Sequence, residues 1–174
     1  MPTGEVLVTE KRGKLFSLAK DGTRTEITGL PSIRAIGQGG LFDVLPARDF
    51  AQTRTVYLSY AGATGNQNTA VSKATLNGNR LENLQEVFQM QTDSRGGRHF
   101  GGRLAQDASG NVFLTIGDRG DRPAAQDDTR HNGMIVRIEP SGNERNWTKG
   151  HRNPQGGIWF LSEGNGALYR LTPR

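Results

Sequence analysis

The feature that most constrains this chain is a succession of short strand-like runs separated by glycine-containing turns. Residues 55–60 (TVYLSY) form a clear strand, because aromatic and β-branched side chains favour a pleated, half-buried backbone. No window carries the sustained i, i+3, i+4, i+7 apolar stripe with caps that marks a helix. The glycine-containing turns fall at residues 21–22, 77–78, 109–111, 141–142 and 164–166. We therefore predict an all-β protein.

The strands repeat as a unit in which a strand, a turn containing glycine and a second strand follow one another. The predicted strands are residues 5–9, 14–18, 24–28, 55–60, 69–76, 84–90, 112–116, 134–138, 158–161 and 167–171, with Leu104 continuing the pattern. Such a unit is typical of four-stranded β-propeller blades, each of roughly 40–50 residues. By that measure the 174 residues hold about four blades in one domain, 1–174. A tight β-sandwich is the alternative.

Charge and composition exclude several classes of protein. The formal net charge is +5, which makes nucleic acid the first partner to consider. Lys and Arg are scattered, however, and no run of five occurs, so we expect no nucleic-acid partner. The excess of arginine is either a solvated surface or a set of cations aimed at a small anionic ligand. The absence of cysteine excludes disulfides and thiolate metal sites.

No stretch of the sequence has the ~18 consecutive apolar residues of a membrane helix, so we expect no membrane partner. No basic and then apolar segment at the N-terminus indicates a signal peptide within this chain.

The run 98–104 (RHFGGRL) carries the first candidate catalytic residue. His99 lies between Arg98 and Phe100, and imidazole is the side chain best suited to moving a proton near neutral pH. The two glycines that follow let a ligand approach the backbone closely. A purely structural histidine is the alternative.

The run 150–156 (GHRNPQG) carries the second set of candidates. Arg152 can stabilise negative charge that develops on oxygen, and Asn153 supplies both a donor and an acceptor. A loop fixed by Pro154, with its polar side chains bonded to the backbone, is the alternative. Gln38 lies in the run 37–40 (GQGG), which is not a phosphate loop because Lys and Ser/Thr do not follow. That glutamine either faces a ligand or belongs to a simple turn.

Acidic and basic residues alternate in the run 117–122 (GDRGDR). Asp118 and Asp121 are candidate calcium ligands, since calcium prefers oxygen. They are also placed to pair with Arg119 and Arg122, and we favour the pairing.

Taken together, these runs resemble the soluble quinoprotein aldose sugar dehydrogenases, which are relatives of soluble glucose dehydrogenase. The matching residues, in the family's order, are 37–41, 49–52, 56–60, 98–104, 115–121, 125–127 and 150–156. The resemblance implies a six-bladed propeller that holds pyrroloquinoline quinone (PQQ) over its central axis, with calcium as a second cofactor. It also implies a periplasmic or secreted location.

The resemblance further implies the reaction and the role of each candidate. The family's quinone takes a hydride from C1 of an aldose sugar while a histidine removes the hydroxyl proton, which yields a lactone, and an external acceptor takes the electrons. By position, His99 resembles that base and Arg152 the arginine that neutralises the reduced quinone. Gln38 and Asn153 match polar residues that line the cofactor site.

The chain departs from the family in length. Six blades need roughly 250–300 residues, the family's calcium-binding stretch after residue 156 is not found, and residues 158–173 resemble the family's own C-terminus. Three explanations are open: a shortened propeller, two chains that associate as a homo-oligomer to complete the ring, or a chain from which segments have been left out. The alternative function is a non-catalytic propeller fragment, or a sugar- or anion-binding module, without a complete cofactor site.

Overall fold

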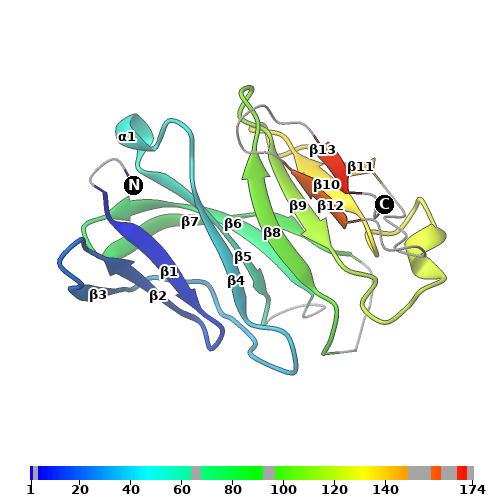
Figure 1. The fold of residues 1–174 in the computed structure, drawn as a ribbon, viewed down its shortest axis with the longest axis horizontal. Coiled ribbons are helices and arrows are strands. Elements are labelled where there is room, and N and C mark those ends of the chain that lie inside the picture. Colours follow the sequence, from blue (N-terminus) through cyan, green and yellow to red (C-terminus); the bar gives the residue numbers. More distant parts are fainter. Residues whose placement is uncertain (2–3, 64–67, 92–96, 149–157, 162–167, 172–174) are drawn as a thin grey trace.

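Antiparallel sheets make up the molecule, as the computed structural model shows for residues 1, 4–63, 68–91, 97–148, 158–161 and 168–171 (Figure 1). The first sheet has three strands, in the order β1 (Val6–Glu10), β2 (Lys14–Leu18) and β3 (Arg24–Ile27). The second has four, in the order β4 (Leu41–Pro46), β5 (Thr55–Ala61), β6 (Thr69–Asn77) and β7 (Arg80–Gln89).

A third sheet also has four strands, which are β8 (Gly101–Gln106), β9 (Val112–Ile116), β10 (Ile135–Ile138) and β11 (Glu144–Thr148). A two-stranded sheet follows, formed by β12 (Ile158–Leu161) and β13 (Leu168–Leu171). The helical elements are α1 (Phe50–Thr53) and the single 3₁₀ turn η1 (Ala124–Gln126). The prediction of an all-β fold built from four-stranded blades is therefore confirmed. Among the described residues, no helix has the length and apolar character needed to span a membrane.

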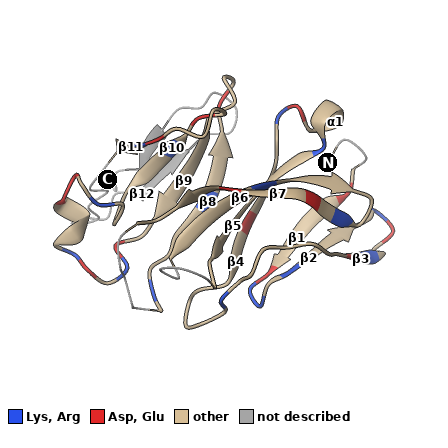
Figure 2. Ribbon diagram, turned by 180° about the vertical axis from the view of Figure 1, so that it is seen from behind, with Lys and Arg blue, Asp and Glu red and all other residues tan. Residues whose placement is uncertain are grey.

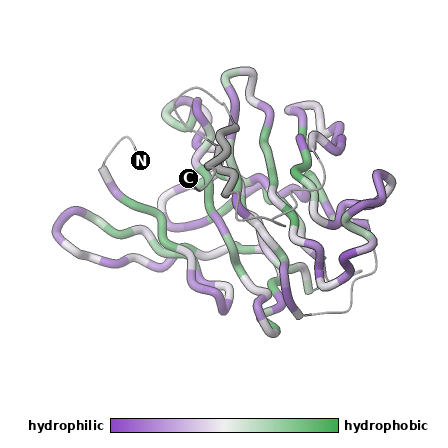
Figure 3. Tube along the Cα trace, turned by 45° about the vertical axis from the view of Figure 1, so that its right-hand side comes forward, coloured by the Kyte–Doolittle hydropathy of each residue, from purple (hydrophilic) through white to green (hydrophobic). Residues whose placement is uncertain are grey.

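The second sheet is buried on both faces, as expected of a blade between two neighbours. Val56 and Leu58 of β5 belong to a core shared with the first sheet, whereas Val71 and Phe88 belong to a core shared with the third. Hydrophobic stretches accordingly lie in the strands and hydrophilic ones in the turns (Figure 3). Lys and Arg are spread over several elements (Figure 2).

Two strands lie outside those predicted from the sequence. Residues Glu144–Thr148, for which the sequence analysis predicts no strand, form β11, the edge strand of the third sheet. Most of its side chains are exposed, and an edge strand of this kind needs no apolar alternation. The sequence analysis does not predict β4 either, because Asp43 interrupts the short apolar run of this strand.

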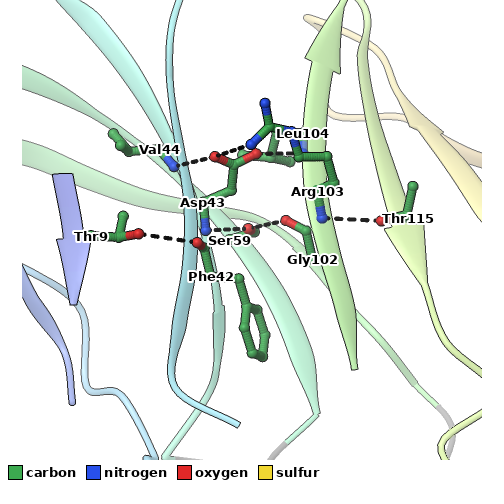
Figure 4. Close-up of polar contacts among 9 residues, drawn as sticks. All are labelled: Thr9, Phe42, Asp43, Val44, Ser59, Gly102, Arg103, Leu104 and Thr115. Atoms are coloured by element: carbon green, nitrogen blue, oxygen red, sulfur yellow. Dashed lines mark hydrogen bonds and ion pairs between the residues drawn. The ribbon is translucent and has the colours of Figure 1, made fainter. Parts of the chain in front are cut away.

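A polar network joins β4 to β8 (Figure 4). The carboxylate of Asp43 accepts hydrogen bonds from the backbone N–H of Leu104 (2.9 Å) and from the guanidinium of Arg103 (3.4 Å). The buried hydroxyl of Ser59 donates to the carbonyl of Gly102 and accepts from the N–H of Asp43 (3.2 Å). These bonds hold the two first strands of neighbouring blades together.

The loops at both ends of this strand pair also meet. Before the strands, the side chain of Gln38 accepts a hydrogen bond from the N–H of His99 (2.7 Å). After them, the side chain of Gln106 accepts one from the N–H of Arg48 (2.8 Å). The two strands therefore run side by side in the same direction, and loops from both blades gather at each end.

Candidate functional site

Two of the predicted site residues, Gln38 and His99, lie in contact at the starting end of β4 and β8. The backbone N–H of Gln38 donates to the carbonyl of Gly97 (2.7 Å), and the N–H of His99 donates to the side-chain oxygen of Gln38 (2.7 Å). These reciprocal bonds fix the loops 36–40 and 97–99 against each other. Among the described residues, the N–H₂ group of the Gln38 side chain has no acceptor, so it is available to a ligand.

The backbone turns sharply at His99, which has a φ of 53°. Non-glycine residues seldom adopt this left-handed conformation. Gly101 follows with a φ of 75°, and a Cβ there would lie 2.5 Å from the carbonyl oxygen of Thr115. Only glycine fits this close approach, and the turn leaves the His99 side chain 51% exposed. The ring is thus within reach of a ligand in solvent.

The imidazole of His99 is held by a carboxylate. Its Nδ1 lies 2.6 Å from Oδ1 of Asp118, which reaches it from the turn after β9. Burial alone would raise the pKa of Asp118. The N–H of Gly120, the hydrogen bond and charge of His99 and the charge of Arg122 outweigh burial, and they hold the pKa of this carboxyl below its ordinary value. Asp118 is therefore an anion near neutral pH.

This contact decides which nitrogen of the neutral ring carries the proton. An ionised carboxylate can only accept a hydrogen bond, so Nδ1 must donate it. The lone pair of the neutral imidazole is then on Nε2. Within the described part of the chain the ring makes no other hydrogen bond. The carboxylate of Asp118 thus sets the orientation and the tautomer of this histidine.

The expected pairing of Asp118 and Asp121 with the adjacent arginines is found only in part. Asp118 contacts His99, and the charge of Arg122 also stabilises its ionised form. Asp121 forms its ion pair with Arg130 (3.6 Å). Arg119 is almost fully buried, with its guanidinium 3.3 Å from the centroid of the Phe100 ring and a hydrogen bond to the carbonyl of Arg98. Burial lowers the pKa of Arg119 to about 10. Sequence spacing does not reveal this packing of Arg119 on the Phe100 ring.

The remaining two predicted site residues, Arg152 and Asn153, lie outside the described residues, and so does the run 150–156 around them. Their predicted position beside His99 stays a prediction.

Comparison with known proteins shows the family to which the chain belongs. A family model described as Glucose / Sorbosone dehydrogenase matches residues 1–171. The chain belongs to this family. The aldose sugar dehydrogenase YliI of Escherichia coli (strain K12) is 35% identical over 170 residues, which are 87% of this chain and 46% of the relative.

Solved structures agree with this membership of the glucose/sorbosone dehydrogenase family. A glucose dehydrogenase is 37% identical, with a TM-score of 0.84 over 97% of this chain and 58% of that one. The PQQ-bound form of an aldose sugar dehydrogenase from Streptomyces coelicolor shares the fold, with a TM-score of 0.81 at 24% identity over 98% of this chain and 53% of that one. The chain thus spans about half the length of the relatives it matches.

The described residues at this end of the strands fit an anionic quinone in their chemistry. Lys11 donates to the carbonyl of Gly37, and Arg98 precedes His99 in the opposite loop. Cationic residues thus belong to or contact both loops, and PQQ is a polycarboxylate. Calcium differs: within the described ranges, no group of three or more His, Asp or Glu side chains is placed to hold a metal ion.

Proposed function

We propose that this chain is part of an oxidoreductase that oxidises an aldose sugar at C1 to the lactone, with PQQ as the hydride acceptor. The observation that supports the proposal best is the 2.6 Å contact between His99 and Asp118 beside the amide of Gln38. The family membership and the names of the relatives point the same way. The Streptomyces coelicolor relative is named as a PQQ-bound protein.

His99 acts as the general base in this proposal. Its Nε2 accepts the proton of the C1 hydroxyl, and the oxygen then forms a second bond to C1 as the hydrogen on that carbon leaves with its electron pair. PQQ, when bound, supplies the two-electron sink that receives this hydride. Asp118 holds the ring in place and stabilises the imidazolium that forms. Gln38 lines the site and keeps the loop of His99 in register.

The other parts of the site follow from the family resemblance. Arg152 is proposed to neutralise the charge on the reduced cofactor, and Asn153 to line the same site. An external acceptor would take the electrons, and a periplasmic or secreted location suits an enzyme that acts on free sugars. Calcium as a second cofactor, and a homo-oligomer that completes the ring, are part of the same expectation.

Reconstitution tests the proposal. The purified chain is incubated with PQQ and calcium, and reduction of a dye by glucose is followed for the parent and for His99→Ala. Loss of a general base lowers kcat by roughly 10²- to 10⁴-fold. Because His99 is exposed and Ala is smaller, PQQ binding, measured by fluorescence, should be retained. Equal dye reduction by the parent and His99→Ala would eliminate the proposed base.

A non-catalytic propeller fragment, or a sugar- or anion-binding module, is the second candidate. The observation that favours it is the cationic character of the loops around Gln38 and His99, where Lys11 donates to the carbonyl of Gly37 and Arg98 precedes His99, which suits an anionic ligand without catalysis. Calorimetric titration with PQQ separates the two candidates. Heat of binding at micromolar PQQ supports the enzyme, and its absence supports the fragment.

A further inference from the structure

A cavity lies between the second and third sheets, at the opposite ends of β4 and β8 from His99. It has a volume of about 590 Å³, within the size range of small-molecule sites. Its lining comes from the segment after β4, the faces of β5, β6 and β7, and the hairpin between β8 and β9. α1 and that hairpin lie on the same side of the molecule (Figure 1). Six residues of β8 separate this groove from the His99 loop, roughly 20 Å of strand.

One row of side chains crosses the floor of the groove. Tyr57 pairs with Lys73, and Lys73 pairs with Gln85, at matching positions of β5, β6 and β7. Tyr57 and Lys73 are half-buried. In the described part of the chain, the ammonium of Lys73 has no ion pair and no hydrogen bond, and the phenol of Tyr57 has no hydrogen bond. A half-buried cation without a partner is costly unless a ligand or water satisfies it.

The charges of the groove fit a monoanion. Its charged residues are Arg48, Lys73 and Asp49, with a formal sum of +1. Among the described residues, the guanidinium of Arg48 is also without an ion pair. Two cations that converge on one cavity suit a carboxylate, and a single nearby acid disfavours a doubly charged phosphate.

The neutral part of the lining fits hydroxyl groups. Amide side chains from β7 and hydroxyls from β5, β6 and the opposite hairpin offer donors and acceptors around the Tyr57 ring. Burial, followed by the charge of Asp49, raises the pKa of the Tyr57 phenol. The phenol therefore stays protonated near neutral pH and can donate a hydrogen bond. A flat ring with such groups around it is suited to a polyhydroxylated ligand.

We propose that this groove is a binding site for a sugar acid, a small polyhydroxylated monoanion whose carboxylate is bound by Lys73 and Arg48. Tyr57 and the amides of Asn83 and Gln85 contact its hydroxyl groups. The site goes beyond the proposed oxidation of aldoses and uses none of the residues assigned to it.

Titration with D-glucuronate, followed in the ¹H–¹⁵N spectrum of the chain, tests the proposal. We expect shift changes centred on the backbone amides of Lys73, Gln85 and Ser109. Lys73→Met keeps the length of the side chain and removes the cation, and it should weaken binding roughly tenfold. Lys73→Arg should keep most of the affinity. Lys14→Met is the charge-matched control. Lys14 is an exposed residue of β2 that pairs with Glu26 of β3, and the variant should bind glucuronate as the parent does.

Four outcomes would overturn the proposal. They are shift changes centred on Gln38 and His99, undiminished binding by Lys73→Met, equal affinity for neutral D-glucose, and tighter binding of inorganic phosphate than of glucuronate. His99→Ala distinguishes failure of this proposal from failure of the proposed function. It removes the proposed base at the starting end of β4 and β8 and leaves the groove at the other end unchanged. Glucuronate binding that survives in His99→Ala supports the groove whatever the dye assay gives.

Discussion

The contact between His99 and Asp118 yields the sharpest prediction. Asp118→Asn keeps the shape of the side chain but replaces an obligatory acceptor with an amide that can turn its N–H₂ group toward Nδ1. With the amide nitrogen toward the ring, Nδ1 accepts the hydrogen bond and Nε2 carries the proton. The N–H of Gly120, which donates to the same Oδ1 in the parent, opposes this turn, so the shift in tautomer is partial. A ring in that tautomer cannot take a proton at Nε2. The variant should therefore lose activity while the fold stays intact.

The magnitude follows from the geometry. A hydrogen bond to a charged group is worth about 1.5–3 kcal/mol, which is roughly 10- to 150-fold in an equilibrium between tautomers. The side chains of His99 and Asp118 are 51% and 25% exposed, so water competes for both partners. The loss in kcat/KM should therefore be near the lower end, about 10- to 30-fold. KM for the sugar should change little, because Asp118 orients the base and does not bind substrate.

Two measurements check this prediction. Dye reduction by the reconstituted protein gives kcat and KM, and the ¹⁵N chemical shifts of the imidazole report the tautomer directly, without cofactor. Asp121→Asn is the matched control, since it removes the same charge three residues away and loses only the pair with Arg130. The reasoning is refuted if the parent ring carries its proton on Nε2, or if Asp118→Asn and Asp121→Asn have the same kcat/KM.

Three further predictions concern stability and are checked by urea unfolding. Asp43→Ala leaves the N–H of Leu104 without its acceptor and should lower the free energy of unfolding by about 1–3 kcal/mol. Gly102→Ala places a Cβ 2.6 Å from Phe42 at a φ of 105°, and should cost roughly 1–3 kcal/mol. Burial alone would raise the pKa of Asp107, but hydrogen bonds from Asn111 and Ser109 outweigh burial and hold this pKa below its ordinary value of 3.8. The ionised Asp107 therefore contributes its full stabilisation to the fold above pH 3.8, and the contribution is lost as the pH falls through the lower pKa of the folded state. Asp107→Asn should therefore destabilise the protein near neutral pH and lose this effect in acid.

Each of these has its own control. Asp43→Asn keeps one acceptor for the N–H of Leu104 and should cost less than Asp43→Ala. Gly142 also has a positive φ, 91°, but a Cβ there would have no atom within 4 Å. Gly102→Ala must therefore lower the free energy of unfolding more than Gly142→Ala does. For Asp107→Asn, a difference from the parent that stays constant from neutral pH into acid would contradict the assigned cause.

Sequence patterns predicted the β-architecture well because the evidence for it is local. Alternation in β5 and the turn at Gly78 lie within a few residues of the strands they define. β11 shows the limit of this reasoning. It is an exposed edge strand, and its pairing with β10 depends on hydrogen bonds that any backbone can make. Such a strand has no compositional mark to distinguish it from a linker.

The sequence names candidate residues for the site, but it does not predict the contacts that they make. His99 and Gln38 were chosen for their chemistry, and they do meet, although they are 61 positions apart. Asp118 was considered only as a calcium ligand or as a partner of its neighbours in sequence. The ring that it contacts is 19 positions away, across the β8–β9 hairpin. Only the register of that hairpin brings them together, and side-chain charge alone does not predict it.

The bonds between β4 and β8 give the two proposed sites a common support. β4 and β8 are fixed against each other by Asp43 and Ser59 near their middle, so a ligand at either end meets loops that cannot slide relative to one another. The hydrogen bond between His99 and Gln38 joins the loops at one end, and the hydrogen bond between Arg48 and Gln106 joins those at the other. A single change in the middle should therefore disturb both ends. Asp43→Ala should shift the backbone resonances of His99 and of Gln106 together, whereas independent loops would respond one at a time.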